Sequence, residues 1–118
     1  MGKTTILTSV QFAVRGDQIE EFERLIAEFT ARAELEPGTL TYRFFRGAPG
    51  RYAVIGEYED TDAALAHQAG NQDLLARAAT CTDHFVMQVH GPVGPVIRAW
   101  AENDPTVTLY EDPVLPLG

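Results

Sequence analysis

Two kinds of hydrophobic pattern alternate along this chain, and their order restricts the folds that it can adopt. Four segments are typical of strands because their apolar residues alternate with polar ones or because they are rich in β-branched and aromatic residues; these are residues 5–14, 39–46, 52–59 and 83–92. Two others, residues 17–36 and 61–79, have the composition and spacing of helices. The order β-α-β-β-α-β predicts an α+β fold of the ferredoxin-like, split βαβ type, with two helices on one face of a four-stranded antiparallel sheet.

Capping and turn residues set the limits of the two predicted helices. Asp17, with a glutamate three positions later, has the spacing of a capping box, which predicts that the first helix begins there. The proline and glycine at 37–38 end it. Thr61 is expected to cap the second helix, and the glycine and asparagine at 70–71 to interrupt it.

The 118 residues predict a single domain, 1–118, with its core in residues 5–92. The extension 93–118 contains VIRAWAEN, which is typical of a short helix carrying Trp100, and PTVTLYE, which is typical of a fifth strand. The helices cover one face of the sheet, whereas apolar groups lie on both, so we expect the open face to form a homodimer. The extension is expected to pair with the partner's sheet edge.

Charge and cysteine content narrow the classes of partner and compartment. The formal net charge of −8 has the wrong sign for binding nucleic acid or an anionic membrane surface. Cys81 is the single cysteine and cannot form an internal disulfide, and residues 1–10 lack the pattern of a signal peptide. Without a segment of about 20 apolar residues, the chain is expected to be a soluble cytoplasmic protein that does not enter membranes.

Two longer segments add a family resemblance. EPGTLTYRFF at 36–45 and RYAVIGEYEDTDAALAHQAG at 51–70, in this order of elements, resemble the antibiotic biosynthesis monooxygenase family of dimeric α/β barrels over residues 5–92. The resemblance implies oxidation of electron-rich phenols, anthrones or quinols by dioxygen without metal or flavin, in a pocket between helices and sheet. It maps the family pattern to the turn 36–38, Tyr42, the pair 57–58 and His67. Heme degradation is not expected, since the tryptophan and asparagine implied for that branch have no counterpart.

His67 is the first candidate for chemistry. Helical spacing places it on the face with Ala63, with Gly70 or Asn71, and with Leu74, which predicts that it points toward the sheet. A histidine there can take a proton from a phenol, because an unperturbed imidazole has a pKa of about 6.5. The alternative is a packed histidine that is hydrogen-bonded to a strand carbonyl or to Glu57.

The aromatic strand residues have two interpretations. They pack the core, or they line a flat pocket in which a tyrosine hydroxyl fixes a substrate oxygen. Trp100 either closes such a pocket or seals the dimer. The predicted catalytic residues are His67, Tyr42 and Tyr58, and the predicted substrate contacts are Phe44, Tyr52, Glu57, Phe85 and Trp100.

No cofactor and no metal are expected. His84 and His90 share a strand face and Cys81 is nearby, but residues six positions apart on an extended strand are separated by about 20 Å. The sequence therefore favours a cofactor-independent monooxygenase that oxidises a hydrophobic, aromatic, polyketide-like small molecule in secondary metabolism. A non-oxidative cyclase or isomerase of a polyketide intermediate, and a non-catalytic binding or accessory dimer, remain the alternatives.

Overall fold

The computed structural model of the chain describes residues 5–114. In chain order the elements are β1 (Ile6–Val14), the 3-10 turn η1 (Gly16–Gln18), α1 (Ile19–Leu35), β2 (Thr39–Arg46), β3 (Arg51–Tyr58), α2 (Thr61–Gly70), α3 (Gln72–Ala79), β4 (Thr82–His90), α4 (Gly94–Glu102) and β5 (Val107–Tyr110). The predicted β-α-β-β-α-β order is confirmed, as are the short helix and the fifth strand after it.

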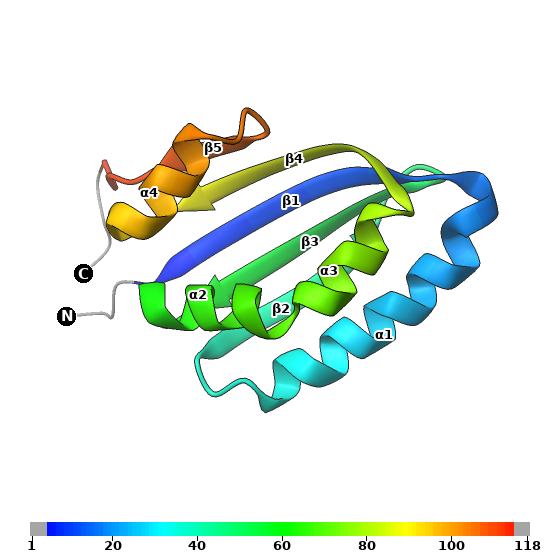
Figure 1. The fold of residues 1–118 in the computed structure, drawn as a ribbon, viewed down its shortest axis with the longest axis horizontal. Helices are drawn as coiled ribbons and strands as arrows, with labels where there is room; N and C mark the ends of the chain where they lie inside the picture. Colours follow the sequence, from blue (N-terminus) through cyan, green and yellow to red (C-terminus); the bar gives the residue numbers. More distant parts are fainter. Residues whose placement is uncertain (1–4, 115–118) are drawn as a thin grey trace.

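One sheet with the strand order β2-β3-β1-β4-β5 forms the back of the molecule, and α1, α2 and α3 lie on one of its faces (Figure 1). The β1–β3, β1–β4 and β2–β3 pairs are antiparallel, as expected for the ferredoxin-like arrangement. The fifth strand, β5, pairs in parallel with β4 of its own chain, and contact of the extension with a partner's sheet edge stays a prediction. The pairing is parallel because α4 carries the chain back along β4, so that β5 runs beside residues 87–90 and completes a short β-α-β crossover.

Helix α1 packs on the sheet through Phe22, Leu25, Phe29 and Ala33, which recur at helical spacing and are buried. The predicted cap at Asp17 is wrong, because residues 16–18 form η1 and α1 begins after it without a side-chain cap. At α2 the capping residue is Asp60 rather than Thr61. The Asp60 carboxylate accepts a hydrogen bond from the Ala63 amide at 2.8 Å.

The core consists of two clusters on the helix-covered face of the sheet. The larger lies beneath α1 and α3 and contains Phe12, Phe22 and Leu74. The smaller lies at the other end of β1 and joins Ile6 and Tyr58 to residues at the start of α4. The alternating burial of β3 confirms the strand period, because the even-numbered residues from Tyr52 to Tyr58 are buried and the odd-numbered ones are more exposed.

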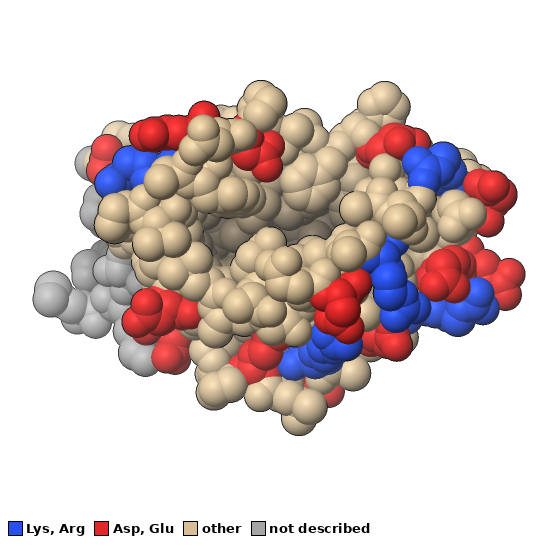
Figure 2. Space-filling view, in the orientation of Figure 1, with Lys and Arg blue, Asp and Glu red and all other residues tan. Residues whose placement is uncertain are grey.

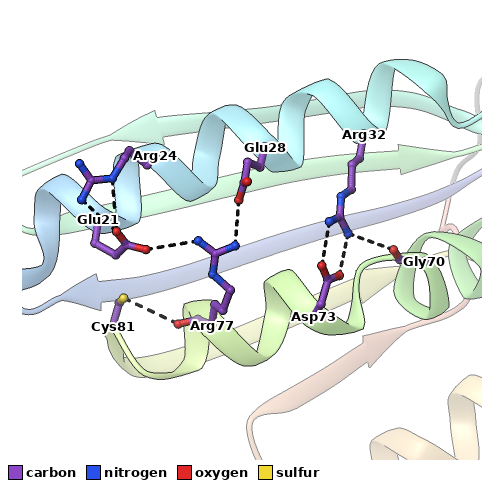
Figure 3. A network of polar contacts seen from close by, with 8 residues as sticks. All are labelled: Glu21, Arg24, Glu28, Arg32, Gly70, Asp73, Arg77 and Cys81. Atoms are coloured by element: carbon purple, nitrogen blue, oxygen red, sulfur yellow. Dashed lines mark hydrogen bonds and ion pairs between the residues drawn. The ribbon is translucent and has the colours of Figure 1, made fainter.

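The break between α2 and α3 falls at residues 70–71, as predicted. Beyond it, α3 runs beside α1, and a ladder of ion pairs joins the two helices (Figure 3). Arg32 pairs with Asp73 at 2.7 Å, and Arg77 pairs with two glutamates of α1. These charges are exposed, so water and salt screen each pair and the ladder adds little to stability.

The opposite face of the sheet carries a mixed surface. Leu7, Phe45 and Val86 are exposed there, together with Arg43, whose guanidinium lies 5.1 Å from the ring centroid of Phe45. Within residues 5–114, no helix has both the length and the apolar character needed to cross a membrane.

Candidate active site

A cavity of about 400 Å³ lies between the sheet and helices α2 and α3. Its walls are mostly apolar, and among the described residues that line it there is no aspartate, glutamate, lysine or arginine. Figure 2 shows the corresponding hollow on the face drawn in Figure 1, with uncharged atoms around it and charged side chains farther out. The cavity size and lining are those of a site for a small, uncharged, hydrophobic molecule.

His67 lies on α2 and lines this cavity, and it is only 8% exposed to solvent. Small residues bring this helix close to the sheet. At Gly38, where β2 is about to begin, a β-carbon would lie only 2.4 Å from that of Ala63, so a larger residue there would push α2 away. The alanine-rich sequence of α2 thus places the imidazole deep between helix and strands.

Glu36, in the turn after α1, holds the imidazole from behind. Its Oε1 lies 2.7 Å from His67 Nδ1 and accepts a hydrogen bond from the Thr39 hydroxyl at 2.7 Å. An ionised carboxylate only accepts hydrogen bonds, so Nδ1 carries a proton, and in the neutral form of the imidazole the free lone pair is on Nε2. Burial tends to raise the pKa of Glu36, but hydrogen bonds from His67, Thr39 and Asn71 outweigh it, and the pKa is lowered.

Asn71 completes this arrangement at the break between α2 and α3. It is fully buried, and its Nδ2 donates to Glu36 Oε2 at 2.9 Å and to the His67 carbonyl at 2.8 Å. Its Oδ1 is buried with no hydrogen-bond partner among the described residues. Asn71 therefore acts as a donor that fixes both the carboxylate and the backbone of the histidine.

Two tyrosines flank the imidazole. The ring centroids of Tyr42 and Tyr58 lie 4.8 and 5.1 Å from that of His67. Burial raises the pKa of both hydroxyls well above the usual range for tyrosine, so both remain neutral hydrogen-bond donors at physiological pH. Gly56 gives Tyr58 its room, since a β-carbon there would lie 2.7 Å from both the Tyr58 hydroxyl and Thr8 Oγ1.

The structure brings together most of the predicted site. The residues that line the cavity, as expected, are His67, Tyr42, Tyr58, Phe44, Phe85 and Trp100. The predicted interaction between His67 and Glu57 is wrong, because strand alternation places Glu57 on the opposite face, where it accepts hydrogen bonds from Thr5 and Thr41.

Tyr52 is also displaced from the site. Tyr52 faces the helices, but it lies at the end of β3 away from His67, where its ring packs against Phe12 and Phe22 and its hydroxyl donates to Glu23 at 2.7 Å. Neither Tyr52 nor Glu57 lines the cavity. Both are therefore removed from the set of predicted substrate contacts.

Sequence reasoning missed Glu36 and Asn71 as partners of His67. Asn71 is four positions after His67 on the same helical face, and that spacing could have indicated a contact. The Glu36 contact spans 31 positions and carried no local signal. Within residues 5–114, no group of three or more histidine, cysteine, aspartate or glutamate side chains converges as a metal site would require.

Comparison with known proteins agrees with this fold. MupZ from Pseudomonas fluorescens is similar, with 21% identity and a TM-score of 0.80 over 98% of this chain and 95% of that chain. SnoaB from Streptomyces nogalater, a cofactor-independent oxygenase, has 20% identity and a TM-score of 0.65 over 73% of this chain and 90% of that chain. Rv0793 from Mycobacterium tuberculosis has 16% identity and a TM-score of 0.69 over 78% and 98%, respectively. At these identities the likeness concerns the fold.

The comparison with curated proteins finds no match for this chain. The profile of the antibiotic biosynthesis monooxygenase family, in contrast, matches residues 5–85, which include β1 to β3, the three helices on the sheet and the first part of β4. The chain belongs to the antibiotic biosynthesis monooxygenase family.

Proposed function

We propose that this chain is a cofactor-independent monooxygenase that oxidises an uncharged aromatic molecule, such as an anthrone, a phenol or a quinol, with His67 as the general base. The observation that carries the proposal is the Glu36–His67 pair at 2.7 Å, with the histidine lining an otherwise uncharged cavity. Family membership supports monooxygenase chemistry at the level of the family. The substrate class rests on the shape and polarity of the cavity.

The proposed reaction follows from which groups can accept and donate protons in the site. For an anthrone, Nε2 of His67 removes a proton from the ring methylene, and Glu36 stabilises the imidazolium that forms. The neutral hydroxyls of Tyr42 and Tyr58 are the nearby donors for the oxyanion of the resulting enolate. The anion passes one electron to dioxygen, and the two radicals combine. The peroxide takes back the proton and loses water, so one oxygen atom enters the product carbonyl and the other leaves as water.

Oxygen uptake by purified protein tests the proposal. With anthrone as substrate, the wild type should consume dioxygen above the uncatalysed rate, and His67→Ala should lower that rate at least about 100-fold, because general-base catalysis typically contributes 10²–10⁴-fold. His90→Ala is the matched control, since His90 contacts the Leu7 carbonyl and Tyr110 away from the cavity. No uptake above background across a panel of anthrones, phenols and quinols would contradict the proposal.

The two alternatives predict other outcomes. A cyclase or isomerase would use the same enolate, so substrate would disappear in a His67-dependent manner without oxygen consumption. A binding or accessory protein would retain ligand with no turnover, and a folded His67→Ala variant would leave the product profile of the producing cells unchanged.

We also propose that the open face of the sheet binds a second copy of the chain. A twofold interface must complement itself, and this face offers exposed apolar residues together with charges of both signs, Arg43 and Glu57. Val86→Glu should convert a dimer into a monomer in sedimentation or light-scattering measurements. Leu35→Glu, at an exposed position at the end of α1, should not. A wild-type monomer at assay concentration would refute this proposal.

A further inference from the structure

Two aromatic residues stand at the mouth of the cavity. Phe85 of β4 and Trp100 of α4 line it, yet they are 42% and 40% exposed, so each side chain borders both the cavity and solvent. The opposite side of the mouth belongs to α2 and α3, where Gln68 and Ala79 are exposed lining residues. Figure 2 shows this hollow, and in the same orientation Figure 1 shows α2 and α3 on one side of the region and β4 and α4 on the other.

A β-bulge lies beside Phe85 in β4. Thr82 and Phe85 both line the cavity although they are three positions apart, which an uninterrupted strand would not permit. The register explains this, because Gln11 pairs with Val86 while Ala13 pairs with Asp83, so Phe12 faces two residues of β4. One of these, His84, has a φ of 57°, and the extra residue places Thr82 on the same face as Phe85, which shares that face with Met87 by ordinary alternation.

The second residue comes from outside the part of the chain that the family profile matches. That match ends at residue 85, whereas Trp100 belongs to α4 in the extension. Val93 and Ile97 are buried against Ile6 and Tyr58, and β5 pairs with β4. The Arg98–Glu111 ion pair at 2.7 Å adds a link between α4 and the segment after β5. The extension therefore forms a packed wall that carries Trp100.

From these positions we infer that Phe85 and Trp100 form an aromatic gate that contacts the part of the ligand farthest from His67 and selects multi-ring planar ligands over single-ring ones. The ligand class rests on the proposed function, whereas the gate itself rests on the places of Phe85 and Trp100 at the mouth. An aromatic ring that extends to the mouth packs against both side chains, and the contact removes the exposed surfaces of all three from water. On this proposal a single ring held beside His67 leaves both side chains uncovered.

Binding measured without dioxygen tests the gate separately from catalysis. Trp100 is the single tryptophan of the chain, so its fluorescence emission should shift to shorter wavelength when anthrone binds anaerobically. Trp100→Ala and Phe85→Ala should each weaken anthrone binding roughly 3- to 10-fold by calorimetry, as expected for the loss of one aromatic contact. Phenol binding, followed by ligand-observed NMR, should be unchanged.

Two further variants separate a gate from a fold defect. Trp100→Phe should restore most of the anthrone affinity, and Val96→Ala, an exposed position on α4 outside the cavity, should leave it unchanged. An unchanged Trp100 emission on anthrone binding, equal weakening of anthrone and phenol, or no anthrone binding to the wild type would overturn the gate. If anthrone binds with the predicted pattern but is not oxidised in air, the gate stands and the proposed oxygenase activity fails.

Discussion

Replacing Glu36 by glutamine tests whether the carboxylate behind His67 is part of the fold as well as of the site. The side chain is 23% exposed, and its two oxygens accept hydrogen bonds from Thr39, His67 and Asn71 at 2.7, 2.7 and 2.9 Å. Glutamine preserves the shape but has one acceptor oxygen. If that oxygen takes the place of Oε1, the amide nitrogen faces Nδ2 of Asn71, donor against donor.

The expected cost follows from these contacts. A hydrogen bond to a charged group contributes about 1.5–3 kcal/mol, and Asn71 is fully buried, so Glu36→Gln should lower the free energy of unfolding by about 2–3 kcal/mol at pH 7. A domain of this size is typically stable by only about 5–15 kcal/mol, so the loss is easily measured.

The stability difference between the wild type and Glu36→Gln should depend on pH. The pKa of Glu36 is lowered in the folded protein from an ordinary value of 4.5. A carboxylate with a lowered pKa contributes stability that is fully present above the unfolded value and is lost as the pH falls through the folded value. The difference between wild type and Glu36→Gln should therefore be largest near pH 7 and should shrink below about pH 4.5.

Urea denaturation at fixed protein concentration, followed by far-UV circular dichroism at several pH values, measures this difference. Glu57→Gln is the matched control. Among the described residues, its carboxylate accepts hydrogen bonds from the hydroxyls of Thr5 and Thr41 alone, at 3.2 and 3.4 Å, and the change should cost less than about 1 kcal/mol. A Glu36→Gln variant as stable as the wild type at pH 7, or equally destabilised at pH 7 and pH 3.5, would refute the reasoning.

Two further changes test backbone positions around the site. Gly56→Ala should destabilise the protein by about 1–3 kcal/mol and perturb the Tyr58 ring, because the new β-carbon would lie 2.7 Å from Thr8 Oγ1 and the Tyr58 hydroxyl; denaturation and the NMR shifts of the ring would show both effects. His84→Gly should be neutral or stabilising by up to about 1 kcal/mol because a φ of 57° suits glycine, whereas His84→Val should lower the unfolding midpoint in urea; the opposite order would contradict the bulge geometry.

The fold could be predicted because its information is local and periodic. The apolar spacing of α1 and the alternation of β1 and β3 each specify which face is buried, and the order of the elements then leaves few topologies. The helix starts were less predictable. At 60–61 aspartate and threonine are both favourable caps, and which of them caps α2 depends on where the preceding chain turns. At Asp17 the turn η1 takes the place of the cap.

The site was predictable only as far as local pattern reaches. Helical spacing sufficed to point His67 inward, but its partner Glu36 is set by how the turn after α1 meets α2. In β4, simple alternation does not place Thr82 and Phe85 on the same side, because a bulge is a conformation of the backbone and leaves little trace in composition. The same limit hid the direction of β5, which depends on the crossover through α4.

Glu36 lies behind His67, so the histidine and not the carboxylate faces the cavity. Glu36 does not line the cavity, its oxygens already accept three hydrogen bonds, and its pKa is lowered, so it is a poor base that holds a fixed negative charge behind His67. In the proposed reaction His67 takes a proton from a neutral ligand, so the new imidazolium would lie between the Glu36 carboxylate and the ligand anion, and the total charge of the site would not change. Because the lining is uncharged, moving a proton within the site costs far less than bringing in an ion. A ligand that arrived as a carboxylate would add a second negative charge beside Glu36 with no basic side chain in the lining to balance it, which favours neutral substrates over anionic ones.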